Sequence, residues 1–104
     1  MMYTILRTDK ASDQLYSIIQ YIAEDSGSVD VALNYLEKLE TEIKKLASTP
    51  YIGSYPRYST LKKQGYRVLI VQRHLVFYKV DEEKKQVMIY AKSKNLSRLI
   101  FYGG

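Results

Sequence analysis

The chain has 104 residues, no cysteine and a formal net charge of +5. This length suits one domain, residues 1–104, which can bury enough apolar surface to fold without a disulfide or a thiolate zinc site. No apolar run approaches the roughly 20 residues of a membrane span, and residues 1–8 lack the apolar stretch of a signal peptide. We therefore expect a soluble, cytoplasmic protein.

The charge is distributed unevenly along the chain. Residues 1–56 hold five Lys and Arg against eight Asp and Glu, a balance of 5 − 8 = −3, and residues 57–104 hold eleven against three, a balance of 11 − 3 = +8. This asymmetry favours a face that meets an anionic partner, such as nucleic acid, a nucleoprotein or an acidic protein. On charge alone, a merely solvated surface is an equally good reading.

The first half of the chain predicts a strand and two helices. Residues 3–8 are short and β-rich, which indicates a strand. Two sets of apolar residues then recur at helical spacing and predict helices over about 10–25 and from residue 29 to just before Pro50, with Asp9 and Ser28 as N-caps. The apolar positions are Ala11, Leu15, Ile18, Ile19 and Ile22 in the first helix, and Val29, Ala32, Leu33, Leu36, Leu39, Ile43, Leu46 and Ala47 in the second. Their short Ser-Gly-Ser connection makes them an antiparallel hairpin.

The second half predicts a loop and three strands. Residues 50–66 are rich in Pro and Gly and indicate a loop. Three β-rich runs follow it, at 66–73, 75–80 and 86–91, joined by a tight turn near Arg73-His74 and by the polar turn 81–85. The run 66–73 is apolar on both faces in its middle, which favours a central strand that is covered on both sides.

The resulting order is strand, helix, helix, strand, strand, strand, which predicts an α+β fold. We expect the helical hairpin to pack on one face of a small, mainly antiparallel twisted sheet. The opposite face, on which we expect Arg67 to lie, would be left free for a large acidic or nucleoprotein partner.

Two long stretches resemble the RelE/ParE toxin superfamily, whose members are also called plasmid stabilisation proteins. They read YSIIQYIAEDSGSVDVALNYLEKLETEIKKLASTPYIGSYPR at 16–57 and GYRVLIVQRHLVFYKVDEEKKQVMIYA at 65–91. The shared pattern is a helix ending in Tyr-Ile, a long helix ending in Leu-Ala, a loop with Pro, Gly and Arg, a Tyr-Arg strand, and a Phe-Tyr-x-Val-Asp strand. All of these occur here in order, over nearly the whole chain.

The resemblance implies the toxin of a type II toxin–antitoxin system and a cognate antitoxin that covers it with a helix or a strand. ParE-like toxins are associated with inhibition of DNA gyrase, and RelE-like toxins cut mRNA in the ribosomal decoding site. The two long helices resemble the ParE-like branch more closely. We therefore expect a ParE-like toxin that binds and inhibits DNA gyrase. A ribosome-dependent mRNA endonuclease is the alternative, and a nontoxic relative that only binds its antitoxin is a third reading.

Arginines and lysines are the main candidates for target contact. An arginine guanidinium grips phosphate or carboxylate through two parallel hydrogen bonds. In RelE-like enzymes an arginine at the Tyr66-Arg67 motif stabilises charge at the scissile phosphate. The alternative is that Arg67 holds the sheet through an acidic residue or meets the antitoxin. Arg57 is expected to anchor its loop or face the target, with anchoring favoured. The expected target-binding set is Arg57, Arg67, Arg73, Lys92 and Arg98.

If the chain is a nuclease, the resemblance implies that Arg67, Lys94, Arg98 and Tyr102 form the catalytic set. Such a set would move the proton of the RNA 2′-hydroxyl and neutralise the phosphorane. The tail departs from the family pattern, because Gly/Arg-Arg-x-x-Tyr is missing and the spacing from Lys94 to Tyr102 is long. This departure disfavours the nuclease reading.

The remaining candidates are weak. His74, the only histidine, is expected to be an exposed turn residue rather than a general base. One histidine and no cysteine make a transition-metal site improbable, and no cofactor is expected. The eleven tyrosines suggest an interface, because tyrosine offers apolar area with a polar tip. Lys79 is expected to extend a basic surface or to be simply solvated.

Overall fold

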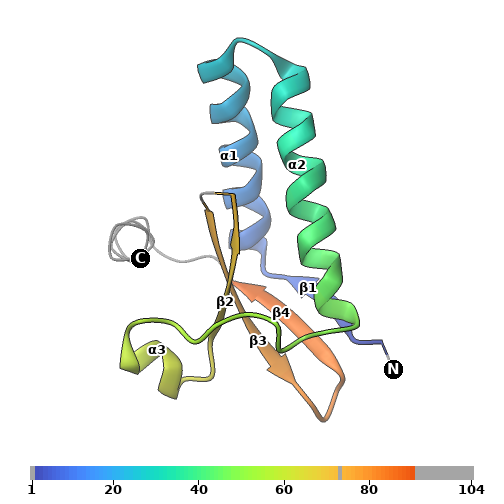
Figure 1. Cartoon of the computed structure of the whole chain (residues 1–104), viewed down its shortest axis with the longest axis vertical. Helices are drawn as coiled ribbons and strands as arrows, with labels where there is room; N and C mark the ends of the chain where they lie inside the picture. Colours follow the sequence, from blue (N-terminus) through green and yellow to red (C-terminus); the bar gives the residue numbers. More distant parts are fainter. Residues whose placement is uncertain (1, 73, 91–104) are drawn as a thin grey trace.

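The computed structural model describes residues 2–72 and 74–90, and its elements follow the predicted order with one addition. The addition is a short helix, α3, within the segment that was expected to be a loop, and η1 is a 3-10 turn that continues α2. Figure 1 shows the arrangement. The elements are β1 (Thr4–Arg7), α1 (Asp9–Ser26), α2 (Val29–Lys44), η1 (Lys45–Ala47), α3 (Ser59–Lys63), β2 (Arg67–Val71), β3 (His74–Asp81) and β4 (Gln86–Tyr90).

The four strands form one mixed sheet in the order β1-β4-β3-β2. β2 pairs with β3 and β3 with β4 in antiparallel register, whereas β1 pairs with β4 in parallel. The expected α+β fold with a mainly antiparallel sheet is therefore confirmed. The expectation that residues 66–73 form a central strand is wrong, because β2 lies at the sheet edge. Its two apolar faces arise because each face meets a separate hydrophobic cluster.

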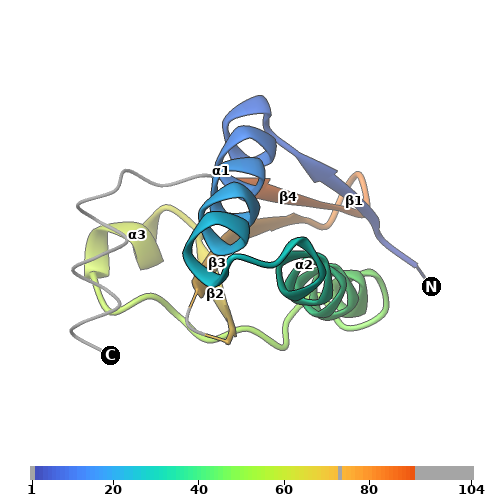
Figure 2. The ribbon, with the colours of Figure 1, turned by 90° about the horizontal axis from the view of Figure 1, so that it is seen from above.

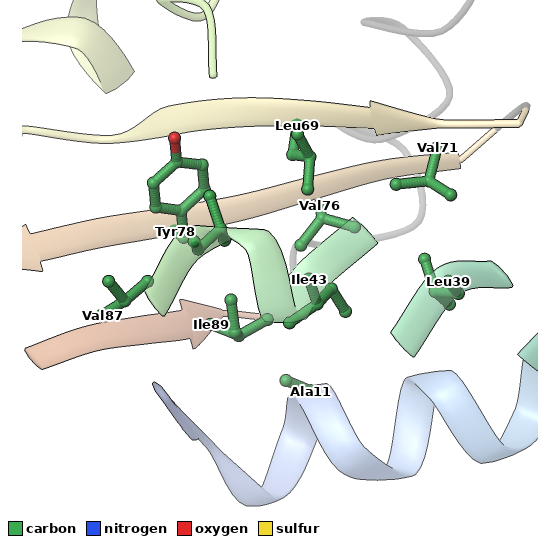
Figure 3. Packing of buried hydrophobic residues seen from close by; sticks show 10 residues of the cluster. Ala11, Leu39, Ile43, Leu69, Val71, Val76, Tyr78, Val87 and Ile89 are labelled. Atoms are coloured by element: carbon green, nitrogen blue, oxygen red, sulfur yellow. The ribbon is translucent and has the colours of Figure 1, made fainter. Parts of the chain in front are cut away.

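The larger cluster lies between the sheet and the helical hairpin. Strand side chains alternate between faces, and one face of β2, β3 and β4 meets α2 and the start of α1. Figure 3 shows this packing. The buried residues of the cluster are Ala11, Leu39, Ile43, Leu46, Leu69, Val71, Val76, Tyr78, Val87 and Ile89. Arg7, on β1, donates a hydrogen bond to the Glu40 carboxylate of α2 at the border of this layer.

The hairpin extends beyond the sheet, as Figures 1 and 2 show. Only Ala11 of α1 is fully buried, and on α2 the predicted core residues Val29 and Leu33 are 65% and 51% exposed. They are exposed because the part of the hairpin nearest its connection has no sheet beneath it. Within the described residues, no helix is both long enough and apolar enough to cross a membrane.

The N-cap of α2 was predicted correctly, and the N-cap of α1 was not. Ser28 caps α2 as expected, since its hydroxyl accepts from the Val31 N–H at 3.3 Å. α1 is capped by Thr8 rather than Asp9, because the Thr8 hydroxyl accepts from the Ala11 N–H at 3.0 Å. Asp9 is instead the first helical residue, where its negative charge still favours the helix dipole. Gly27 ends α1 with φ 68°, a left-handed conformation that glycine adopts without strain.

A smaller cluster on the opposite sheet face is covered by α3. It contains Leu61, Tyr66, Val68 and Phe77, with Leu75 and Tyr90 packed against it. The second face is therefore partly open, as expected, but α3, which was not predicted, covers the other part of it. Ile70, on the same face of β2, remains 66% exposed.

The segment 50–58, between η1 and α3, crosses closely over the edge of β2. The Ser54 N–H donates to the Val68 carbonyl at 2.9 Å, and the Val68 N–H donates to the Ser54 carbonyl at 2.8 Å. The Gly53 N–H donates to the Tyr78 hydroxyl at 2.9 Å. These bonds satisfy part of the otherwise open edge of the sheet.

Glu82, in the turn between β3 and β4, tethers the same segment at the end of the sheet where β2 begins. Its carboxylate accepts hydrogen bonds from the hydroxyl of Tyr51, from the hydroxyl of Tyr3 at 2.7 Å and from Lys85 Nζ at 3.0 Å. These hydrogen bonds, of which the one from Tyr51 has the largest effect, lower the pKa of Glu82 to about 2. The same bond from its hydroxyl to Glu82 raises the pKa of Tyr51 to about 12.

Replacing Gly53 with alanine is expected to destabilise the fold. A Cβ atom at this position would lie 2.7 Å from the Val68 carbonyl oxygen, which belongs to the backbone and cannot rotate away, and would also meet the Tyr78 hydroxyl. We expect Gly53→Ala to lower the free energy of unfolding by about 1–3 kcal/mol, as measured by chemical denaturation. Ser54→Ala removes only an exposed hydroxyl and serves as the control, with an expected change within about 0.5 kcal/mol. Equal stability of the two variants would contradict this packing.

The Glu82 tether predicts a pH dependence of stability. Because the pKa of Glu82 in the folded protein lies near 2, below the unfolded value of about 4.3, the charged carboxylate stabilises the fold above the unfolded pKa. That contribution is lost as the pH falls through the folded pKa. The difference in free energy of unfolding between the native chain and Glu82→Gln should thus be constant above about pH 5 and shrink toward pH 2. A difference that does not change with pH, or one matched by Glu83→Gln, would show that the tether does not form.

Candidate target-binding surface

Arg67, the first residue of β2, fastens the segment 50–58 to the sheet. Its Nη2 donates hydrogen bonds to the carbonyls of Tyr51 and Gly53, at 3.0 and 2.9 Å. Its guanidinium carbon lies 4.7 Å from the centroid of the Tyr55 ring and 5.3 Å from that of Tyr51. Such cation–π contacts add to the hydrogen bonds. The side chain is half-buried, and its Nη2 makes both hydrogen bonds to the loop.

This placement corrects two expectations. Arg67 pairs with Tyr78 across the β2–β3 ladder, so its side chain lies on the sheet face that the helices cover, and not on the opposite face. It holds the fold through backbone carbonyls and not through an acidic residue. Arg57, which was favoured as the loop anchor, is exposed and makes no hydrogen bond or ion pair with any described residue.

The positive charge of the chain is concentrated in residues 43–80, which include the segment that Arg67 holds. Residues 1–42 carry three Lys and Arg against eight Asp and Glu, 3 − 8 = −5, whereas residues 43–80 carry eight Lys and Arg and no Asp or Glu. In Figure 1 the segment 50–63 lies away from the connection between α1 and α2. The helical hairpin is therefore acidic along its length, whereas the segment 50–63 carries Arg57, Lys62 and Lys63 and no carboxylate.

The segment 51–63 exposes both aromatic and cationic side chains. Three tyrosines are exposed by 39–59%, and three cations are exposed beside them. Lys62 Nζ lies 4.7 Å from the centroid of the Tyr55 ring, on which Arg67 also packs. We call this set the cationic tyrosine surface: Tyr51, Tyr55, Arg57, Tyr58, Lys62 and Lys63.

The other expected target-binding residues lie elsewhere or outside the described residues. Lys79 is half-buried on the α3 side of the sheet, where its Nζ lies 4.5 Å from the Tyr66 ring centroid and 5.6 Å from that of Tyr90. The structure does not describe Arg73, Lys92, Lys94, Arg98 or Tyr102.

His74 is not the exposed turn residue that was expected. It begins β3, is half-buried, and its Nδ1 shares a hydrogen bond with the Tyr35 hydroxyl of α2. The two rings meet edge to face with centroids 5.4 Å apart. Burial lowers the pKa of His74 and raises the pKa of Tyr35 to about 12, so both groups are neutral near pH 7. The pair therefore joins α2 to the β2–β3 hairpin as a structural contact.

An open groove of about 660 Å³ lies between α2 and the C-terminal end of β2, beyond the position at which Val68 pairs with Ser54. It is lined by Asn34, Glu37, Lys38, Thr41, Glu42, Ile70, Val71 and Gln72. Within residues 2–72 and 74–90, no three His, Asp or Glu side chains gather to hold a metal ion.

Lys62 and Lys63 were not predicted as site residues, because residues 50–66 were expected to form a loop. The signal that could have found them is the run of 38 residues, 43–80, without a single carboxylate. The excess of tyrosines indicated an interface. The sequence pattern does not show that Tyr51 and Tyr55 both pack on the Arg67 guanidinium.

The sequence matches a known protein family over most of its length. The family model of the ParE toxin of type II toxin–antitoxin systems, parDE, matches residues 5–91. A comparison with curated proteins gave no match. The matched range includes every helix and nearly every strand residue described above, and it confirms the predicted membership of the RelE/ParE superfamily, on its ParE-like side. The chain therefore belongs to the ParE toxin family of type II toxin–antitoxin systems.

Proposed function

We propose that this toxin acts stoichiometrically, by binding DNA gyrase and inhibiting it. The observation that carries the proposal is the arrangement around Arg67. Its Nη2 is hydrogen-bonded to two loop carbonyls, and its guanidinium packs on Tyr51 and Tyr55. An arginine whose Nη2 is bonded to the backbone in this way helps to build a binding surface. It is poorly placed to stabilise the charge that develops on a reacting phosphate.

The exposed composition of the cationic tyrosine surface also supports binding of a large target. Tyrosine and arginine are enriched where macromolecules bind, because they offer wide contact area and several hydrogen bonds. Gyrase acts on DNA and is therefore a nucleoprotein target, which suits a cationic surface. A gyrase target would place the toxin in the cytoplasm.

The alternative, a ribosome-dependent mRNA endonuclease, has weaker support. Of its proposed catalytic set, only Arg67 lies among the described residues, and its Nη2 is committed to the loop. The one described histidine, His74, is bonded to Tyr35, and its pKa is lowered by burial. General acid–base cleavage of RNA needs groups within reach of the 2′-hydroxyl and the leaving oxygen.

Membership of the family implies an antitoxin partner. We propose that the antitoxin neutralises the toxin by covering part of the exposed apolar and charged surface described above. The resulting complex would be a toxin–antitoxin hetero-oligomer.

A supercoiling assay tests the proposed function. Purified toxin is added in increasing molar ratio to gyrase, relaxed plasmid and ATP, and we expect supercoiling to fall as toxin approaches and exceeds gyrase. Adding the cognate antitoxin should restore it. In cells, induction should trigger a DNA damage response before translation stops.

The same assay separates the two candidate functions. Normal supercoiling at a large toxin excess, together with cleavage of mRNA on translating ribosomes that is lost in Arg67→Ala, would establish the endonuclease instead. Induction without growth arrest would show a chain that has lost its toxicity.

A further inference from the structure

We propose that the cationic tyrosine surface is a DNA-binding site that takes the phosphate backbone of a duplex. That the toxin meets this DNA on gyrase rests on the proposed function. Binding of DNA by the surface does not depend on gyrase being the target. The toxin would then meet gyrase partly through the DNA that the enzyme holds.

The first argument is the absence of negative charge. Between Glu42 and Asp81 the sequence has eight cations and no carboxylate, and this stretch supplies the whole surface. A phosphate backbone is a continuous row of negative charges, so a single carboxylate at the contact would repel it. From outside this stretch, the Glu82 carboxylate reaches Tyr51 at the border of the surface, where Lys85 Nζ forms an ion pair with it.

The second argument is the set of free donors. Arg57 and Lys63 are exposed and form no ion pair with any described residue, and Lys62 Nζ packs on the Tyr55 ring without an ion pair among these residues. The hydroxyls of Tyr55 and Tyr58 make no hydrogen bond within the described part of the chain. Arginine, lysine and tyrosine donors are the groups that contact phosphate oxygens in protein–DNA complexes.

The third argument is rigidity. The segment is held by the two Arg67 bonds, by the Gly53–Tyr78 bond and by the Ser54–Val68 pair. A surface that is already ordered loses little conformational entropy on binding. This favours binding even though the contact area is small.

The surface fits DNA better than an acidic protein. Lysine is depleted in protein–protein interfaces, whereas protein–DNA interfaces are much more positively charged. α3 has only five residues, too few to read bases along the major groove. We therefore expect contact with the backbone alone, independent of sequence, with a Kd on the order of 10⁻⁴–10⁻⁶ M at physiological salt.

The test measures binding of a fluorescently labelled 20-base-pair duplex by anisotropy, in the absence of gyrase, between 50 and 200 mM salt. The variant is Arg57→Glu/Lys63→Glu. The control is Lys10→Glu/Lys38→Glu, which changes the net charge by the same −4 but places it on exposed positions of α1 and α2. All four positions are exposed, so both variants should fold, which thermal unfolding checks.

We expect the native chain to bind with an affinity that falls as salt rises. Arg57→Glu/Lys63→Glu should weaken binding at 50 mM salt by at least about tenfold and make the salt slope shallower by about 2, since each phosphate contact contributes about 0.9. The control should bind within about threefold of the native chain, because its charges lie off the surface.

Three outcomes would overturn the inference: no binding by the native chain at 50 mM salt, an equal loss in variant and control, or unchanged binding in the variant. Unchanged DNA binding with lost gyrase inhibition would show that the surface meets protein, and the proposed function would stand. DNA binding through this surface by a toxin that leaves gyrase active would keep the inference and remove the proposed function.

Discussion

The two hydrogen bonds from Arg67 to the carbonyls of Tyr51 and Gly53 hold the segment 50–58 against the start of β2. A segment of backbone without regular structure needs partners for its polar groups. Here one guanidinium supplies donors to two carbonyls, Tyr78 accepts from the Gly53 N–H, and the edge of β2 pairs with Ser54. The segment 50–58 is thereby ordered without a helix or a strand of its own.

The same arrangement explains how one arginine can sit among apolar neighbours. A buried or half-buried charge is costly unless it is hydrogen-bonded. The carbonyls and the faces of Tyr51 and Tyr55 provide this compensation. The Nε of Arg67 is the exception, because it is buried and has no hydrogen-bond partner among the described residues. The hydrogen bonds of Arg67 to the loop are thus all made by its Nη2.

Acidic and basic residues are also separated along the sequence, and they therefore lie on different elements of the fold. The two helices that cover one face of the sheet contain all eight acidic residues of the first half, and the segment after them contains none. The connection between α1 and α2 and the α3 segment lie in different parts of the molecule, as Figures 1 and 2 show. A small protein of this design offers two chemically distinct surfaces, which suits a toxin that must meet both a target and an antitoxin.

The sequence predicted those parts of the fold that rest on local patterns. The spacing of Leu36, Leu39 and Ile43 indicated α2, and Ser28 indicated its start. The edge position of β2 was not predictable, because an apolar pattern on both faces shows that two layers cover a strand and says nothing about its neighbours. α3 was missed because five residues are too few for helical periodicity to show.

The role of Arg67 was the hardest feature to predict. The motif Tyr66-Arg67 pointed to an important residue, but the partners of its guanidinium, the carbonyls of Tyr51 and Gly53, are 16 and 14 residues away along the chain. Carbonyls are present at every residue, so no sequence pattern marks the two that accept. Only the fold brings them to the start of β2.

Hydrogen exchange at the Gly53 and Ser54 amides in Arg67→Ala tests this account most directly. Both amides are hydrogen-bonded, to the Tyr78 hydroxyl and to the Val68 carbonyl. If Arg67 holds the segment, both amides should exchange much faster in the variant, while amides in the middle of β3, such as that of Phe77, keep their protection. Unchanged protection at Gly53 and Ser54 in a folded Arg67→Ala protein would contradict it, because the segment would then be ordered without the arginine.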